Sequence, residues 1–148
     1  MKKLSHVDRR GNARMVDVSA KPLQVREAVA SGVIFLKPST LALISTNRIA
    51  KGNVLNTARL AGIQAAKRTS ELIPLCHPLT LTHVEVDLRP ARDSIEITAT
   101  AKITAQTGVE MEALTAVAVT ALTIYDMCKA VDKEMVIGEI KLVSKTKK

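Results

Sequence analysis

Thirteen consecutive residues without a charge, Ala113 to Tyr125, constrain the fold more than any other stretch of this sequence. A run of this length is too short to span a bilayer and is typical of a helix buried in a protein core. Acidic residues precede the run and Lys129 follows it, which suits the dipole of a helix. We therefore expect one long buried helix over 110–131.

The core around this helix has to be aliphatic. The 148 residues include one Phe, one Tyr and no Trp, although 47% are hydrophobic. The length fits one domain, 1–148, with mobile ends over 1–14 and 145–148. Because small aliphatic side chains each bury little area, we expect the chain to complete its burial in a homo-oligomer.

The remaining pattern predicts an α+β fold. We expect a strand over 33–37, a helix over 40–48 with Ser39 as its N-cap, a helix over 53–72, a hairpin of strands 81–88 and 94–103 joined by a turn at 89–93, and a last strand over 135–144. This order is that of the ferredoxin-like split βαβ arrangement, an antiparallel sheet with two helices packed on one face.

Charge and cysteine content indicate the compartment and the class of partner. The N-terminus lacks the apolar segment of a signal peptide, and two cysteines are too few for a disulfide framework, so we expect a reduced, cytoplasmic protein. The net charge of +8 is compatible with nucleic acid, acidic lipid or a small polyanion. The terminal lysines are more simply interpreted as solvated chain; these are Lys2, Lys3, Lys145, Lys147 and Lys148.

The expected long helix ends in an acid and a base on one face, Asp126 and Lys129. They are three positions apart and could simply form a structural ion pair. Glu112 projects in a similar direction to Asp126, but fourteen residues of helix place it roughly 21 Å away along the axis. If both carboxylates are catalytic, either the ligand is long or the site combines two chains.

A stiff loop, LIPLCHPL at 72–79, presents Cys76 and His77 between two prolines. A rigidly held histidine suits acid–base work, although a lone histidine is more often a satisfied turn residue. Cys76 and His77 are adjacent, and His83 and Cys128 complete no known ligand spacing, so we expect no metal site.

Several cations lie at or near the helix over 53–72. Lys51 and Gly52 precede it, Arg59 and Lys67 lie close to one of its faces, and Arg26 lies upstream. Backbone N–H groups at such a helix start attract phosphate, but the phosphate-binding pattern GxxxxGK[ST] is absent. From these residues alone, a solvated basic face is the better interpretation.

Long segments of the chain resemble the molybdenum cofactor biosynthesis protein C family, whose members are cyclic pyranopterin monophosphate synthases. The segments are MVDVSAK (15–21), VREA (25–28), TARLAGIQAAKRT (57–69), LIPLCHPL (72–79), TGVEMEALTA (107–116) and YDMCKAV (125–131). The resemblance implies a ferredoxin-like subunit in a hexamer of three dimers with active sites at subunit interfaces. It also implies a lyase that converts (8S)-3′,8-cyclo-7,8-dihydroguanosine 5′-triphosphate to cyclic pyranopterin monophosphate and releases diphosphate.

The resemblance also implies the site residues. The catalytic residues would be Lys51, Asp126 and Lys129, with both lysines transferring protons and Asp126 tuning Lys129. The substrate-binding residues would be Cys76, His77, Glu110, Met111 and Glu112, with Arg26 and Lys67 as phosphate contacts. Many members place His before the lysine and Gly-Asp after it, whereas this chain reads IAKGN at 49–53. The sequence requires no cofactor, and Mg²⁺ can accompany the triphosphate.

Two other interpretations fit parts of the sequence. A basic ferredoxin-like module could bind RNA without catalysis, but Phe35 and Tyr125 are its only aromatic residues for base stacking. A catalytically inactive scaffold homologue is the third interpretation, against which the retained Lys51, Asp126 and Lys129 argue.

Overall fold

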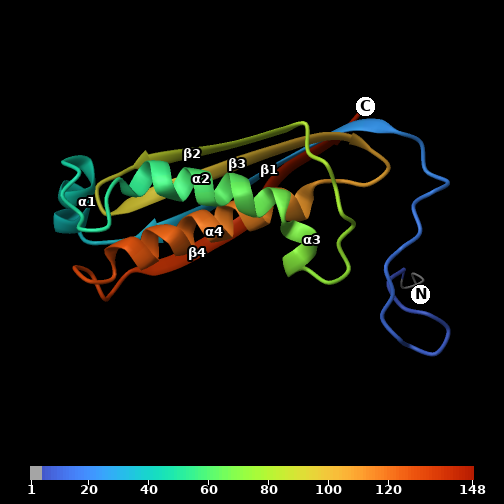
Figure 1. Ribbon diagram of the computed structural model, residues 1–148, viewed down its shortest axis with the longest axis horizontal. Helices are drawn as coiled ribbons and strands as arrows, with labels where there is room; N and C mark the ends of the chain where they lie inside the picture. Colours follow the sequence, from blue (N-terminus) through green and yellow to red (C-terminus); the bar gives the residue numbers. More distant parts are fainter. Residues whose placement is uncertain (1–4) are drawn as a thin grey trace.

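A single antiparallel sheet, covered on one face by two long helices, makes up the body of the molecule (Figure 1). The computed structural model describes residues 5–148. In chain order the elements are β1 (Gln24–Phe35), α1 (Pro38–Ser45), α2 (Val54–Lys67), α3 (Thr69–Leu72), β2 (His83–Pro90), β3 (Ser94–Ala105), α4 (Glu110–Cys128) and β4 (Val136–Lys147). The strand order is β2-β3-β1-β4, and every pairing is antiparallel. The expected ferredoxin-like α+β fold is confirmed.

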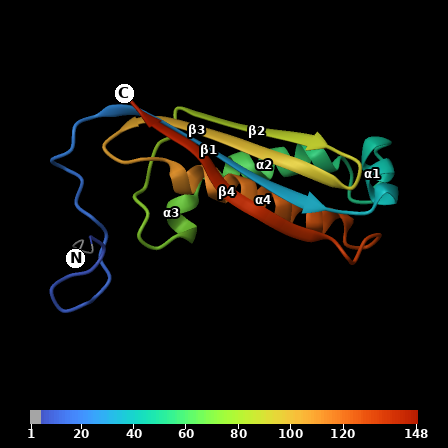
Figure 2. The same cartoon turned by 180° about the vertical axis from the view of Figure 1, so that it is seen from behind.

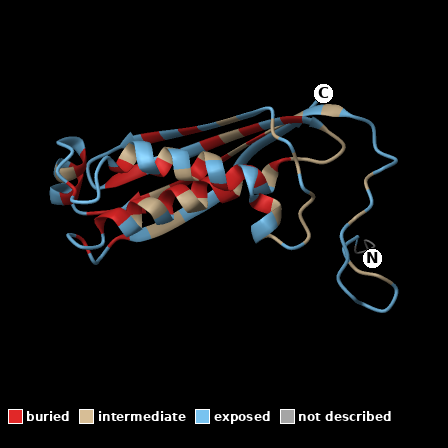
Figure 3. Cartoon of the chain, in the orientation of Figure 1, coloured by how far each residue is buried: buried red, intermediate tan, exposed pale blue. Residues whose placement is uncertain are grey.

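The core lies between the sheet and helices α2 and α4, while the other face of the sheet is open (Figures 2 and 3). Alternate residues of β3 point toward the helices, and Ile95, Ile97 and Ala99 are fully buried. The residues between them are polar, such as Glu96 and Thr98, and they face away from the helices. Period-two alternation thus gives one buried and one solvated face.

Small residues let the layers approach closely. At Gly32 of β1, an added Cβ would lie 2.7 Å from Val117 Cγ1 of α4. At Gly62 of α2, it would overlap the Thr120 hydroxyl and lie 3.0 Å from the Ala116 carbonyl oxygen. Glycine and small aliphatic residues at these contacts therefore allow tight helix–helix and helix–sheet packing.

The first strand is much longer than predicted. The prediction covered 33–37, whereas β1 spans Gln24–Phe35 and forms the centre of the sheet. Its inward residues under α4 include Ala28 and Ala30, which are fully buried. Alanine has a weak strand preference, and close packing overrides that preference here.

Two helix predictions also need correction. Ser39 is not an N-cap, because α1 begins at Pro38 and Lys37 occupies the cap position. Proline suits the first helical position, where its missing N–H is not required. The expected helix over 53–72 is divided into α2 and the short α3 at Arg68, which has non-helical backbone angles of φ −115° and ψ 16°.

The chain end is part of the sheet. Residues 145–147, predicted as a mobile tail, belong to β4, and Lys147 is in register with Arg26 of β1. Backbone bonds of 2.9 Å in both directions join Val25 and Lys148. At the other end, an isolated bridge pairs Val7 with Ala13, while residues 1–4 of the predicted mobile segment, including Lys2 and Lys3, lie outside the described residues.

Helix α4 is long and apolar enough to cross a membrane by length and composition. It packs against α2 and the sheet instead, and its side chains at Ala113, Ala116 and Ile124 are fully buried. The uncharged run is thus the core helix that the sequence predicted, ending at Cys128 rather than at 131.

Candidate functional site

Two lysines converge on one carboxylate where α4 ends. Lys51 Nζ lies 2.7 Å from Asp126 Oδ2, and Lys129 Nζ lies 2.8 Å from Asp126 Oδ1. Lys51 Nζ also donates to the Asp126 backbone carbonyl at 3.2 Å. The structure therefore brings together the three predicted catalytic residues, and we call Lys51, Asp126 and Lys129 the lysine–aspartate cluster.

The two sides of the cluster come from different parts of the chain. Asp126 lies in the last turn of α4, and Lys129 is the residue that caps the helix. Lys51 lies in the turn before α2, where Gly52 has φ +98°, a conformation that side chains disfavour. Asn53 then caps α2 by accepting a 2.9 Å hydrogen bond from Asn56 N.

The cluster fixes the charge of its members. Hydrogen bonds from Lys129 and then Lys51 lower the pKa of Asp126 to about 2. The hydrogen bond to Asp126 in turn raises the pKa of Lys129. At neutral pH the carboxylate is therefore ionised and Lys129 is protonated.

The predicted substrate-binding residues share a cavity near the other end of α4. Its volume is about 430 Å³, and its lining includes Cys76, His77, Glu110, Met111 and Glu112. Glu110, Met111 and Glu112 form the first turn of α4, while Cys76 and His77 come from the loop between α3 and β2. We call this space the α4 cavity.

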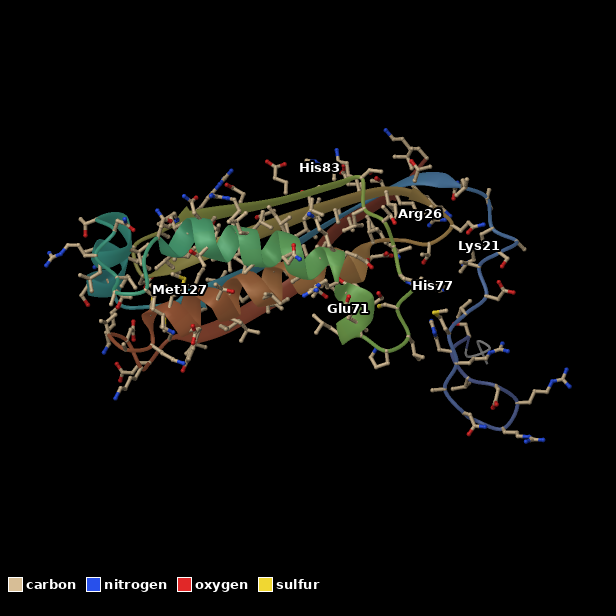
Figure 4. The ribbon with its side chains drawn as sticks, in the orientation of Figure 1. Lys21, Arg26, Glu71, His77, His83 and Met127 are labelled. Atoms are coloured by element: carbon tan, nitrogen blue, oxygen red, sulfur yellow. The ribbon has the colours of Figure 1, made fainter. Side chains whose placement is uncertain are left out.

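His77 is held in place by the N-terminal segment. Its Nε2 lies 2.6 Å from the Val16 carbonyl oxygen, so this ring nitrogen carries the hydrogen. Nearby, the Gln106 side chain donates to the Ser19 carbonyl at 3.3 Å. In Figure 4 the segment before β1 passes beside the loop between α3 and β2 that carries His77.

Burial favours protonated groups inside the α4 cavity. Glu112 is 4% exposed, and burial raises the pKa of its carboxyl. Burial, followed by the charge of Glu112, also raises the pKa of the Cys76 thiol. Burial thus favours the neutral form of the Glu112 carboxyl, and Cys76 is a poor nucleophile in this setting.

Glu110 lies between the α4 cavity and a neighbouring cavity of about 240 Å³. Burial works to raise the pKa of Glu110, but the 3.0 Å hydrogen bond from Lys145, a hydrogen bond to the backbone and the charges of Lys145 and Arg26 together outweigh it, and the pKa is lowered. Arg26, Lys145 and Lys147 also line this second cavity. The sequence missed Lys145, because only the register of β4 against β1 places it opposite α4.

The two predicted phosphate contacts are placed differently. The Arg26 guanidinium lines the second cavity but also donates to the carbonyls of Ala105 and Gln106, at 3.2 Å each. Lys67 ends α2 with an exposed side chain and lines neither cavity. The phosphate-binding roles of both residues stay predictions.

Sequence reasoning also missed the N-terminal side of the α4 cavity. Ser5, His6, Val16, Val18 and Lys21 line it, because the irregular segment before β1 passes its mouth. The motif MVDVSAK carried no local chemical signal beyond Lys21, and its place at the cavity follows from the tertiary fold.

The lysine–aspartate cluster and the α4 cavity lie at opposite ends of one helix. In Figure 4, Met127, the neighbour of Asp126, lies at one end of the molecule, while His77, Lys21 and Arg26 lie at the other. The sequence estimate of roughly 21 Å between Glu112 and Asp126 along a helix axis therefore applies. Among residues 5–148, no group of three or more His, Cys, Asp or Glu side chains could hold a metal ion.

Comparisons with known proteins identify the family of this chain. The family model described as "MoaC family" matches residues 15–148. A cyclic pyranopterin monophosphate synthase of Parvibaculum lavamentivorans is 59% identical over 147 residues, which cover 98% of this chain and 92% of that protein. The synthase of Pelotomaculum thermopropionicum is 58% identical over 148 residues, covering 99% and 87%, respectively. A protein named cyclic pyranopterin monophosphate synthase 3 from Mycobacterium tuberculosis is 60% identical over 144 residues, covering 97% and 81%. The family match over residues 15–148 and the identity to these synthases show that this chain belongs to the MoaC family.

Proposed function

We propose that this chain is a cyclic pyranopterin monophosphate synthase of molybdenum cofactor biosynthesis. It converts (8S)-3′,8-cyclo-7,8-dihydroguanosine 5′-triphosphate to cyclic pyranopterin monophosphate and releases diphosphate. The observation that carries this proposal is the convergence of Lys51 and Lys129 on Asp126 in a chain of this family. The reaction needs repeated proton transfers, and two ammonium groups on one carboxylate can supply them.

The lysine–aspartate cluster performs the acid–base steps. Lys129 is protonated when the reaction begins, because Asp126 stabilises its charge. It donates this proton as the purine ring opens. Lys51 shares the same carboxylate from the opposite side and assists the remaining transfers. Closure of the cyclic phosphate requires a sugar hydroxyl to attack phosphorus, with the hydroxyl proton passing to a base.

The α4 cavity binds the substrate. Its loop and helix residues offer donors and acceptors to the purine-derived ring through His77 and Glu112. The triphosphate requires cations, both for binding and for stabilising the leaving diphosphate. Arg26 at the adjoining cavity and Lys67 on α2 are proposed for that role, with Mg²⁺ able to accompany the phosphates.

The complete active site combines two copies of the chain. One subunit supplies the lysine–aspartate cluster and its neighbour supplies the α4 cavity, because the two lie at opposite ends of α4 within one chain. Exposed apolar residues are available for subunit contacts; they include Leu60, Leu122, Val131 and Val136. We propose a homohexamer of three dimers with active sites at the subunit interfaces, located in the cytoplasm.

A turnover assay on purified protein tests the reaction. The substrate is supplied as the cyclised dihydro-GTP, and diphosphate and the cyclic pterin are measured together. We expect the two products in a 1:1 ratio, and Lys51→Ala or Lys129→Ala should lower kcat by about 10²- to 10⁴-fold without unfolding the protein. Binding without either product would indicate an inactive homologue, and a lysine variant with the wild-type rate would remove that lysine from the mechanism.

Mixing two inactive variants tests the shared site. Lys51→Ala is defective in the cluster and Glu112→Gln in the cavity. If a site takes one half from each chain, random co-assembly of equal amounts should restore about a quarter of the sites. Mixing either variant with itself is the control, and a mixture that stays as inactive as its components would contradict the shared site.

The RNA-binding alternative is not supported. The relatives of this chain are named as synthases, and the fold places Tyr125 in α4, not on the sheet. Phe35 ends β1, so the sheet carries a single aromatic side chain among the described residues. Sheets that bind RNA stack two or three bases on aromatic residues, which this sheet does not provide.

A further inference from the structure

A buried carboxylate, Asp132, lies four residues after the end of α4 and is 1% exposed. Its Oδ2 accepts hydrogen bonds from Lys37 N at 2.9 Å and from the Thr40 hydroxyl at 3.1 Å, and its Oδ1 accepts from Glu134 N at 3.1 Å. Three uncharged donors thus satisfy a buried carboxylate, which would otherwise be strongly unfavourable.

The groups around Asp132 determine its charge state. Burial works to raise its pKa, but the hydrogen bonds from Lys37, Glu134 and Thr40 outweigh it, and the pKa is lowered. The Lys37 and Glu134 side chains pair with each other at 2.7 Å nearby. The buried Cys128 thiol is the remaining titratable neighbour, and burial raises its pKa to about 11. Asp132 is therefore an ionised group with a fixed set of partners.

These hydrogen bonds join the two segments that carry the lysine–aspartate cluster. On one side, Asp132 lies three positions after Lys129, and its N–H donates to Cys128 O at 3.0 Å. On the other side, its carboxylate holds the start of α1, the helix that leads to the Lys51 turn. The residue Asp132 therefore connects the end of α4 to the start of α1.

The connection from α1 to Lys51 is itself tightly bonded. Arg48 N donates to Leu43 O at 2.8 Å, so the turn folds back on the helix. Ile49 is 6% exposed and anchors the turn in the core, and Gly52 N donates to Ile49 O at 3.0 Å. A shift of α1 would therefore carry Lys51 with it.

The cluster cannot fix its own geometry. The side chains of Lys51 and Lys129 are 50% and 57% exposed, respectively, and exposed ion pairs contribute only about 0.2–1 kcal/mol. Acid–base catalysis depends on placement within about 0.5 Å, which requires a rigid supporting shell. Among the described residues, Asp132 is the buried polar side chain that bonds to both supporting segments.

We propose that Asp132 is a positioning residue, which sets the distance between Lys51 and the Asp126–Lys129 pair by holding α1 against the end of α4. The catalytic part of this proposal rests on the proposed function. Asp132 itself touches none of the reacting groups and acts through the backbone at Lys37 and the hydroxyl of Thr40.

The test compares Asp132→Ala with the more conservative Asp132→Asn and with Thr40→Val. In the Asn variant, the amide oxygen can keep the Lys37 and Thr40 donors, while its NH₂ group faces Glu134 N–H. Thr69→Val is the matched control, because Thr69 is as buried as Thr40 but bonds only to the helix carbonyls of Ala65 and Ala66.

We expect Asp132→Ala to lower kcat at least about tenfold with KM nearly unchanged, and to shift the pH profile of kcat. Thr40→Val should do the same to a smaller extent, and Asp132→Asn should recover most of the rate. Thr69→Val should lower the melting temperature without altering the profile. If Asp132→Ala and Thr40→Val lower only the melting temperature, with kcat and its pH profile unchanged, Asp132 is merely structural and the proposal is wrong.

A second measurement does not depend on turnover. Carbon-13 NMR of the Asp126 carboxyl reports how closely the two lysines approach it. Asp132→Ala and Thr40→Val should raise the Asp126 pKa from about 2 toward 3.8, because Lys51 moves away, whereas Asp132→Asn should change it little. An unchanged pKa in Asp132→Ala and Thr40→Val would overturn the positioning role even if the chain catalysed a different reaction, and a raised pKa would support it in that case too.

Discussion

The Lys51 ammonium lies 2.7 Å from the Asp126 carboxylate, although the two residues are 75 positions apart in the chain. The other ion pair of this carboxylate is local, because Lys129 lies three positions after Asp126 in the sequence. The long-range contact adds a second ammonium group to an ordinary ion pair at a helix end, so that two lysines share one carboxylate. A carboxylate that accepts from two ammonium groups is kept ionised, so both lysines keep a fixed partner.

Lys129→Ala should raise the pKa of Asp126 from about 2 toward its ordinary value of 3.8. The largest cause of the lowered pKa is the hydrogen bond from Lys129, and the variant removes it. A depressed pKa means that the ion pair stabilises the fold above pH 3.8 and that this stabilisation is lost as the pH falls toward 2. Carboxyl NMR titration measures the shift, with Lys133→Ala as a control; equal Asp126 titrations in all three proteins would contradict the assignment.

Glu112→Gln should flatten the dependence of stability on pH. Burial raises the Glu112 pKa, so between pH 4.5 and that higher value the folded protein binds more protons than the unfolded chain. The free energy of unfolding of the wild type therefore falls as the pH rises through this window, and glutamine removes the contribution. Melting temperatures across this range measure the effect. Glu85→Gln, at an exposed position on β2, should retain the wild-type slope.

Gly62→Ala should destabilise the protein although alanine favours helix. The propensity gain is about 1 kcal/mol, but the new methyl group would overlap Thr120 and approach the Ala116 carbonyl to 3.0 Å. Overpacking a rigid contact costs about 1–3 kcal/mol, and backbone atoms yield less than side chains. Urea unfolding should show the loss, whereas Gln64→Ala on the exposed side of α2 should change stability by less than about 0.5 kcal/mol.

Gly52→Ala should reduce both stability and turnover. Its φ of +98° is strained for alanine, although no atom lies within 4 Å of the added methyl group. The conformational cost is about 1–3 kcal/mol, and relief of that strain displaces the adjacent Lys51. Gly11→Ala is the matched control, because Gly11 also has positive φ and open space but lies in the N-terminal segment. Equal kcat values in the Gly52 variant and the wild type would show that this turn does not position Lys51.

His77→Ala should release the N-terminal segment. The variant loses the 2.6 Å hydrogen bond to the Val16 carbonyl, so trypsin should cleave faster after Arg14. Limited proteolysis followed by mass spectrometry measures the rate. His83→Ala is the control, because His83 lies on β2 with an exposed side chain. Equal cleavage rates in the two variants would mean that His77 does not hold the segment.

The sequence by itself determined the elements with strong periodicity. The uncharged run could only be buried as a helix, and the alternation over 94–103 could only give a strand with one inward face. Asn53 as a helix cap and the Asp126–Lys129 pair also follow from spacing, since both contacts span three positions. Such local interactions depend on backbone geometry that the sequence specifies directly.

The tertiary structure decided what lies far apart in sequence. It gave β1 its full length, because Ala28 and Ala30 have weak strand preference and gain from packing under α4. The register of β4 placed Lys145 against Glu110. The packing of α1 against the end of α4 placed the Asp132 carboxylate at the start of α1. It also placed the lysine–aspartate cluster and the α4 cavity at opposite ends of one helix. These relationships arise from packing many residues at once, and no local pattern encodes them.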